Sequence, residues 1–225
     1  MCGRYVAAKP PAELAAELGV HDVRATDLGA RYNVAPTDEV YAVAVGSDGE
    51  RRLGTFRWGL VPSWSKDASG AARMINARAE TVADKPAFRQ ALRKRRCLIP
   101  ADGFYEWLRT GKERQPFWFH RPGGETICFA GLWEVWRPKD EPDAELLRTC
   151  TIITAGPNSV MRPIHDRMPV VLPPDAWDRW LDKGVADVAD LLVPAPDDLL
   201  VRTKVSTKVN NARNDGPDLL DPLPE

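Results

Sequence analysis

Residues 126–136, TICFAGLWEVW, are the longest of several runs rich in aromatic and β-branched side chains, a composition typical of β-strands. Similar runs cover residues 41–45, 53–61, 97–99, 104–108, 116–120, 149–154 and 169–172, and a hairpin loop is expected around Gly111. Helices are predicted at residues 10–18, 86–96 and 175–181, inserted between strands rather than alternating with them. This order predicts an α+β fold with a mostly antiparallel, curved or barrel-like sheet and a few flanking helices.

The composition indicates a chain that folds by itself. Hydrophobic residues make up 44% of the 225 residues, and the 20 prolines and 16 glycines are spread without a low-complexity linker, so we expect one domain over residues 1–225. No apolar run approaches the length of a membrane span, and the first residues have no apolar region of the kind found in a secretory leader, so we expect a cytoplasmic protein that is nucleoid-associated when bound to DNA. We also expect a monomer. Past residue 195 the sequence is polar and is predicted to be irregular.

The formal net charge of −1 provides no general attraction for nucleic acid, so DNA binding would need a local cationic patch. Residues 89–96, RQALRKRR, place five cationic side chains in eight positions and are the strongest candidate. The same pattern is also typical of a solvated helix end, where cations are favoured by the helix dipole.

The four cysteines form no CxxC pair and have no histidine at metal-ligand spacing, so we expect no metal. Cys97, Cys128 and Cys150 lie in apolar runs and are predicted to be buried thiols. Cys2 is the cysteine outside such a run.

Cys2 follows the initiator Met, which an aminopeptidase can remove before a small side chain. The chain would then begin with an α-amine beside a thiol, whose reference pKa values are about 7.7 to 8.0 and about 8.5, so both are partly available near neutral pH. An aldehyde is their natural partner, because the amine forms a Schiff base and the thiolate then closes a thiazolidine ring. Position alone favours a Cys2 without a chemical role.

Further polar segments interrupt the strand-like runs at residues 31–37, 74–81, 101–107 and 165–169, a pattern typical of a cleft. Glu106 lies between two aromatic residues that would share the opposite face of a strand, where desolvation can raise a carboxyl pKa toward neutrality, although a surface glutamate is also possible. His165 could carry a proton and Arg167 could bind a phosphate. The alternative is that His165 has a purely structural role. Asn76 and Arg78 would share a face if this segment is extended. The alternative is that they cap a helix or form a salt bridge.

The segments MCGRY, RYNVAPT, RWGLVPSW, INARAET, CLIPADGFYEW, FAGLWE and IHDRMPVVL follow one another in the order found in the SRAP family, the SOS-response-associated, abasic-site-processing proteins. They run from residue 1 to about residue 172, and VSTKVNNARNDGPDL near the C-terminus is similar to the closing segment of the family. The chain therefore resembles this family over most of its length.

The resemblance implies a positively charged channel for single-stranded DNA and covalent crosslinking to abasic sites, without a metal or other cofactor. It implies four catalytic roles, for the crosslinking aminothiol, its orienting partner, the proton carrier of the ring-opening sugar and a helper at the sugar oxygen: Cys2, Asn76, Glu106 and His165. The implied DNA contacts are phosphate ligands and residues that stack on or wedge beside bases: Arg4, Arg78, Arg167, Pro36 and Trp64. Ser65 follows Trp64 where some relatives have a second tryptophan, which weakens the stacking expected there.

Two other functions remain open from the sequence. Cys2, Glu106 and His165 could form a thiol peptidase of the N-terminal-nucleophile kind, and the Schiff base at an abasic site could also support lyase chemistry. A module that binds single-stranded DNA without a covalent bond is the second alternative.

Overall fold

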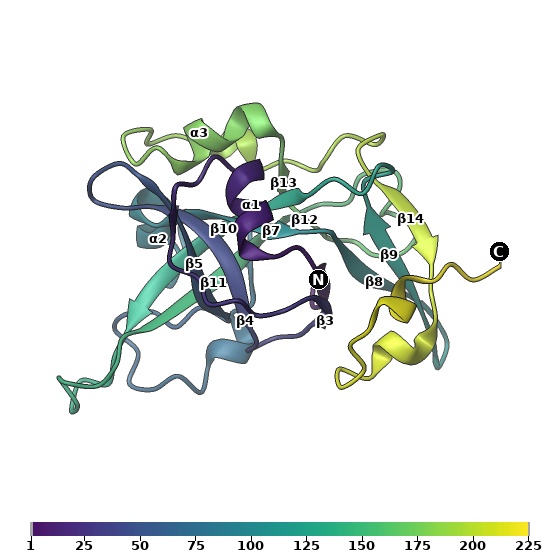
Figure 1. Cartoon of the computed structure of the whole chain (residues 1–225), viewed down its shortest axis with the longest axis horizontal. Helices are drawn as coiled ribbons and strands as arrows, with labels where there is room; N and C mark the ends of the chain where they lie inside the picture. The colour runs from purple at the N-terminus through teal and green to yellow at the C-terminus, as the bar shows by residue number, and fades with distance from the viewer. Residues whose placement is uncertain (1, 225) are drawn as a thin grey trace.

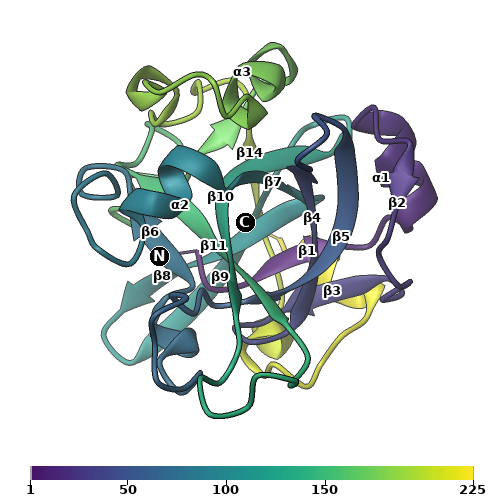
Figure 2. The same cartoon turned by 90° about the vertical axis from the view of Figure 1, so that its left-hand side faces the viewer.

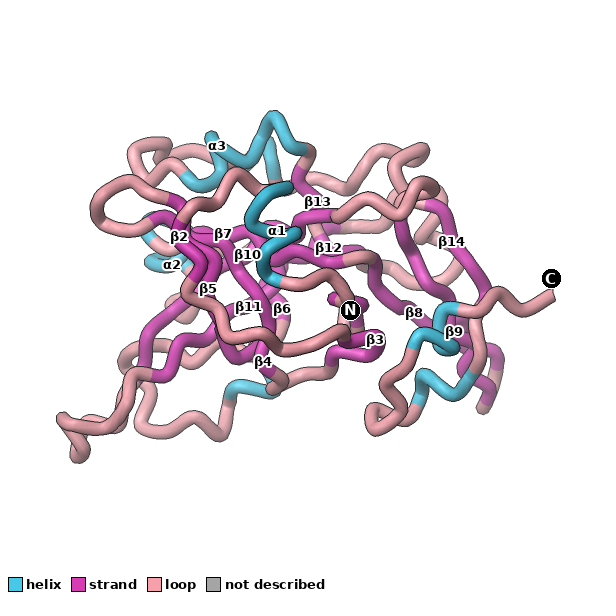
Figure 3. Tube along the Cα trace, viewed as in Figure 1, coloured by secondary structure: helices cyan, strands magenta, loops and turns pink. Residues whose placement is uncertain are grey.

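The computed structural model describes residues 2–224 and has the mostly antiparallel α+β architecture that the sequence predicts (Figure 1). Its strands are β1 (Tyr5–Ala7), β2 (Asp22–Val23), β3 (Arg31–Val34), β4 (Glu39–Val45), β5 (Arg51–Trp58), β6 (Asn76–Arg78), β7 (Arg96–Ala101), β8 (Gly103–Thr110), β9 (Glu113–His120), β10 (Ile127–Trp136), β11 (Leu147–Ala155), β12 (Met168–Pro169), β13 (Val171–Leu172) and β14 (Val201–Lys204). The α-helices are α1 (Pro11–Glu17), α2 (Arg89–Lys94) and α3 (Trp177–Leu181), and the 3-10 turns are η1 (Ala71–Arg73), η2 (Pro174–Ala176), η3 (Ala189–Leu191), η4 (Thr207–Asn210) and η5 (Pro217–Leu220). Figure 3 shows the helices as short segments around a framework of strands.

One sheet closes into a barrel in the order β11-β10-β7-β4-β5. β5 closes it because, besides its antiparallel pairing with β4, it pairs in parallel with β11 at Thr149↔Arg57 and Cys150↔Trp58. Closure satisfies backbone groups that an open sheet would leave at its edges. The barrel-like sheet expected from the sequence is therefore confirmed.

β10 shows why these apolar runs are strands with two buried faces. Phe129 packs into the core inside the barrel, whereas Ala130 and Leu132 belong to a second core beneath the helices. Gly131 lies between them, and a Cβ there would be 2.8 Å from the sulfur of Cys97, so a larger residue would force the strands apart. Alternation over two apolar faces explains why the run has no polar side.

A second sheet, in the order β14-β9-β8-β1-β3, packs beside the barrel and holds the beginning of the chain. β1 lies between β8 and β3, with Tyr5 opposite both Phe104 and Val34. Figure 1 shows the N-terminal end between the barrel and β8, β9 and β14. The hairpin expected around Gly111 joins β8 to β9, and Gly111 has the positive φ of 62° that favours glycine.

The candidate cationic patch at residues 89–96 is not continuous, because its last two arginines are engaged by other parts of the fold. The helix ends at Lys94, and Arg95 donates to Glu134 at 2.7 Å. Arg96 is only 4% exposed, because its guanidinium lies over the Trp180 ring and satisfies buried backbone carbonyls. The exposed cations left on α2 are Arg89, Arg93 and Lys94.

The prediction of an irregular chain past residue 195 is wrong in part. β14 pairs with β9 over four residues, with Val201 opposite His120, and η4 and η5 follow it. The buried side chain of Asn33 donates to carbonyls of this distant segment, those of Val209, Asn211 and Asn214. Partners from far along the chain thus order a segment whose own sequence is polar. Between residues 2 and 224, no helix is long and apolar enough to cross a membrane.

Candidate functional site

Cys2 lies at the junction of the two sheets, three residues before β1 begins at Tyr5. The carbonyl of Arg4 accepts a hydrogen bond from the Tyr105 N–H at 3.0 Å, which fixes the first residues beside β8. The Cys2 side chain is 0% exposed and packs in the barrel core, so all four cysteines are buried and not just the three predicted.

Burial changes the chemistry expected of this thiol. It raises the pKa of Cys2 well above its ordinary value, and the negative charge of Glu106 raises it further. With the thiol buried in this way, the ionised form is disfavoured, whereas the reference pKa alone would leave the thiol partly ionised near neutral pH. A reaction of Cys2 needs a neighbouring group that accepts this proton.

Asn76 connects the end of the barrel to Cys2. It is the first residue of β6, which runs parallel to β11 with Asn76 opposite Ile152. Its side-chain Nδ2 donates to the Cys2 carbonyl oxygen at 2.8 Å. Figure 2 shows the N-terminal end and β6 on the same side of the barrel. The sequence places these residues 74 positions apart, and the parallel pairing brings them into contact.

Glu106 lies on β8, 3% exposed, and belongs to the same neighbourhood because its charge acts on Cys2. Burial raises the pKa of Glu106 to about 7, against the smaller opposing effects of the Trp107 N–H and of the Arg109 charge. Tyr105 and Trp107 pack on the other face of the strand, as the alternation predicts. A carboxyl with this pKa is present in both protonation states near neutral pH.

His165 lies in the segment between β11 and β12. The backbone N–H of Arg167 donates to His165 Nδ1 at 3.0 Å, which in a neutral ring places the proton on Nε2. Burial lowers the pKa of His165, although the Asp166 carboxylate, 3.0 Å from Nδ1, acts in the opposite direction. The imidazole is therefore mostly neutral at pH 7, with Nε2–H as its donor.

The three arginines expected at phosphates differ in how they are held. Arg4 donates to Asn33 at 2.8 Å, and Arg167 makes a two-point ion pair with Glu80 at 2.6 and 2.9 Å. Arg78, on β6, is exposed, and no group of residues 2–224 holds its guanidinium. Arg78 is therefore available to a phosphate without losing a bond.

Trp64 and Pro36 lie on loops around the barrel end. Trp64 is 58% exposed, and the neighbouring Ser65 carbonyl accepts a hydrogen bond from the Trp136 indole at 2.9 Å. Pro36 is half-buried and precedes Thr37, which has a φ of 76° and donates from its backbone N–H to the Trp58 carbonyl. The exposed indole can stack on a base, and the Pro36 turn is held rigidly beside the barrel.

Two residues at the site carried no prediction. Arg109 lies three positions after Glu106 on β8, and its positive charge lowers the pKa of both Glu106 and His165. One cation therefore acts on two acid–base groups that lie in distant segments of the sequence. Asn33 holds Arg4 and the C-terminal segment together. Asn33 lies in a polar segment noted from the sequence, whereas nothing in the local sequence distinguishes Arg109 from a surface cation.

Comparisons with known proteins agree on one family. The family model described as SOS response associated peptidase (SRAP) matches residues 1–212. Abasic site processing protein YoqW of Bacillus subtilis is 42% identical over 194 residues, which cover 84% of this chain and 85% of that protein. Abasic site processing protein HMCES of Xenopus tropicalis is 34% identical over 76% of this chain and 57% of its own length.

Solved structures show the same fold. A crystal structure of a protein from Bacteroides thetaiotaomicron superposes with a TM-score of 0.88 at 25% identity, covering 99% of this chain and all of that one. A second, from Bordetella bronchiseptica, has a TM-score of 0.76 at 28% identity and covers 91% of this chain.

Proposed function

The chain belongs to the SOS response associated peptidase (SRAP) family, and from this premise we propose that it recognises abasic sites in single-stranded DNA and links to them covalently through Cys2. The observation that carries the proposal is the hydrogen bond from Asn76 to the Cys2 carbonyl, next to a buried carboxyl whose pKa is about 7. Met1, whose removal would free the Cys2 amine, lies outside the described residues.

The first step of the proposed reaction opens the abasic sugar. Glu106 in its carboxylate form accepts the proton of the C1′ hydroxyl and returns it to the ring oxygen, which also accepts a hydrogen bond from His165 Nε2–H, as the bond from that oxygen to C1′ breaks. The products are an aldehyde and a hydroxyl. The raised pKa of Glu106 lets this carboxyl take up and release a proton near neutral pH, and the lowered pKa of His165 keeps its ring neutral, with Nε2–H as a hydrogen-bond donor.

The second step forms the crosslink. The Cys2 amine adds to C1′ and the adduct loses water, giving an imine. Glu106 accepts the thiol proton, the sulfur bonds to C1′, and the imine nitrogen takes up a proton, which closes a thiazolidine. Because the thiol pKa is raised by burial, a neighbouring base such as Glu106 is needed for this closure. Asn76 would hold the Cys2 backbone in place throughout.

We propose that Arg78 binds a phosphate beside the lesion and that Trp64 stacks on a base. Arg4 and Arg167 would reach phosphates only by sharing their present partners, so we assign them mainly to positioning Asn33 and the segment around His165. If ring closure is slow, the imine permits strand cleavage by β-elimination, so lyase activity would be a side reaction of the same site.

The test is a denaturing gel of the protein mixed with an abasic single strand. We expect an adduct that survives heat and detergent in the wild type and is lost in Cys2→Ala. Cys97→Ala, which removes another buried thiol, is the matched control and keeps the adduct. An adduct that persists in Cys2→Ala would refute the proposal, and mass spectrometry of the intact chain shows whether Met1 is absent.

Borohydride distinguishes the roles of the amine and the thiol. Cys2→Ser keeps the α-amine, so reduction should trap its imine as a stable adduct, while untreated samples dissociate. Turnover of added peptides by the wild type, without an adduct to DNA, would instead favour the thiol peptidase.

A further inference from the structure

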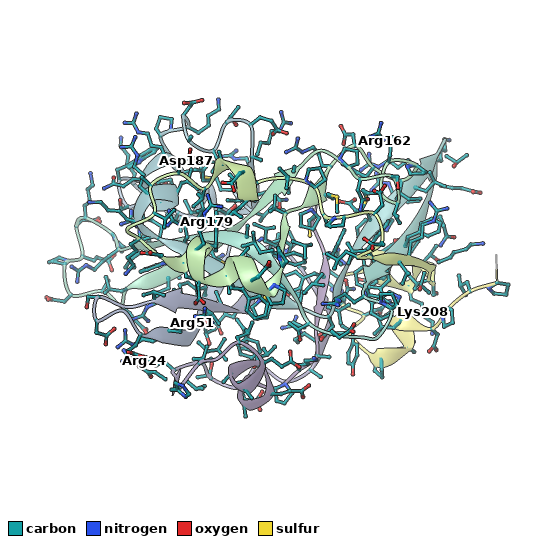
Figure 4. The ribbon with its side chains drawn as sticks, turned by 90° about the horizontal axis from the view of Figure 1, so that it is seen from above. Arg24, Arg51, Arg162, Arg179, Asp187 and Lys208 are labelled. Carbon is teal, nitrogen blue, oxygen red and sulfur yellow. The ribbon has the colours of Figure 1, made fainter. Side chains whose placement is uncertain are left out.

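A cavity of about 600 Å³ opens at the mouth of the barrel, between β5 and the first residues of β11. None of the residues proposed above for the reaction or for DNA contact lines it. In Figure 4, Arg24 on the cavity rim lies toward one end of the long axis, whereas Lys208, in η4 of the C-terminal segment that Asn33 holds, lies toward the other end. The cavity thus needs an explanation of its own.

The opening follows from the way the barrel closes. β5 and β11 pair only at residues 57–58 and 149–150, so the strands separate before that point and leave the interior accessible. Gly54 and Ala44 line the gap with almost no side chain. The aromatic wall consists of Phe56 and the partly buried Trp133, whose ring centroids are 5.9 Å apart at an angle of 68°.

The rim of the cavity is cationic. Its lining includes four arginines and two glutamates: Arg24, Arg52, Arg57, Arg148, Glu39 and Glu145. Arg24 and Arg52 both pair with Asp22, which lies outside the lining. Across residues 2–224, no carboxylate lies within ion-pair distance of Arg57 or Arg148, whose strands meet at Thr149↔Arg57. Because Arg57 is opposite Thr149 and Trp133 is opposite Cys150, side-chain alternation places Arg148 on the face of Phe56 and Trp133, and Arg57 on the other face. Arg148 therefore offers a guanidinium, unpaired within residues 2–224, at the edge of the aromatic cavity.

We propose that this cavity binds one nucleotide unit, with its base against Trp133 and Phe56 and its phosphate at Arg148. Aromatic rings bind the flat face of any base, and guanidinium groups match phosphate oxygens in charge and geometry. The volume lies in the range usual for small-molecule sites, which are often found at the mouths of β-barrels. Glu39 and Glu145 disfavour a ligand with several negative charges and thus favour a single phosphate.

The nucleotide unit has two possible sources, a free nucleotide or another part of the DNA strand that reacts at Cys2. Arg148 precedes Ile152, the residue opposite Asn76, by four positions on β11, or roughly 13 Å along the strand. A DNA strand can cover this distance within a few nucleotides. The second source rests on the proposed function, whereas the first does not.

The first experiment measures binding of deoxyadenosine monophosphate by calorimetry. We expect Arg148→Glu, at an exposed position, to weaken binding about tenfold or more, because a charge-assisted phosphate contact becomes a repulsion. Gly54→Leu fills the cavity and should abolish binding. Lys112→Glu, the same charge reversal in the exposed turn between β8 and β9, is the matched control and should bind as the wild type does.

The second experiment measures the affinity of Cys2→Ala for strands with a stable abasic analogue and one to five nucleotides on either side. A strand source predicts a gain of affinity at one length on one side, absent when Arg148→Glu is added. Either of two results supports the cavity as a nucleotide site. One is binding of the free nucleotide by the wild type that the cavity variants weaken or abolish, and the other is the gain of affinity at one strand length. If neither readout differs between the wild-type cavity and Arg148→Glu, the inference is overturned. Loss of crosslinking alone would refute the proposed function and leave the calorimetric result standing.

Discussion

Glu106 on β8 and Glu134 on β10 are buried to nearly the same extent, 3% and 6% exposed, but their surroundings differ. On the outside of the barrel, Glu134 accepts hydrogen bonds from Arg95 at 2.7 Å and from the Val135 N–H at 3.0 Å. At the junction of the sheets, burial outweighs the favourable contacts of Glu106 and raises its pKa to about 7. Burial of a carboxyl is therefore compatible with either a structural or a reactive role, and the groups around it decide which.

The largest effect should come from Glu106→Gln. The amide can neither accept nor deliver a proton, so we expect the rate of adduct formation at pH 7 to fall about 100-fold or more. Single-turnover gel assays with abasic single strands measure this rate. Glu134→Gln serves as the control and should react at the wild-type rate. Equal rates for the two variants would remove the distinction between the two carboxyls.

The pH dependence of stability should sharpen the same contrast. The pKa of Glu106 is raised from 4.5 to about 7 in the folded protein, so the folded state binds this proton more tightly than the unfolded chain. The stability that this protonated carboxyl contributes is fully present below pH 4.5. It is lost as pH rises to about 7, and the free energy of unfolding falls by up to about 3 kcal/mol over that range. Urea unfolding at a series of pH values should show this decline in the wild type and in Glu134→Gln. The decline should be absent from Glu106→Gln, and parallel curves for all three proteins would contradict the assignment.

Glu134→Gln should instead lower stability by about 2 kcal/mol near pH 7, because it replaces a charge-assisted hydrogen bond to the mostly buried Arg95. Urea unfolding measures the loss. Arg95→Ala together with Glu134→Gln should cost less than the sum of the two single changes, since both remove the same contact. Additive losses would show that the pair does not interact.

The smallest effect is expected at Arg78, which lies beside the site and is not held by the rest of residues 2–224. Arg78→Ala should leave the unfolding free energy unchanged, weaken binding to single-stranded DNA several-fold, and reduce the slope of log affinity against log salt by about 1 or less. Arg167→Ala should show the reverse balance, with a loss of stability because Glu80 loses its two-point partner. Anisotropy titrations at several salt concentrations separate the two arginines.

The long strands could be predicted because each carries a continuous apolar or aromatic run. The short ones could not: β1, β3, β6 and β14 are polar or brief, and they are ordered by pairing with distant strands. The strand predicted to end at residue 61 stops at Trp58, because Gly59 turns the chain with a φ of 133° and its α-carbon lies against the Ala71 backbone. The predicted strand over residues 169–172 is divided between β12 and β13, which pair with different neighbours.

The chemistry-bearing residues were named from the sequence, since amine, thiol, carboxyl and imidazole keep their identities in any fold. The α+β class, the predicted hairpin and the resemblance to the family follow from the same local information. The tertiary structure decided which of these groups can influence one another. It buried the Cys2 thiol, raised the pKa of Glu106, withdrew Arg96 from the surface and separated Arg78 from Arg167 in role. Solvation and charge at a side chain depend on neighbours that the fold brings from far along the chain, and no local pattern specifies them.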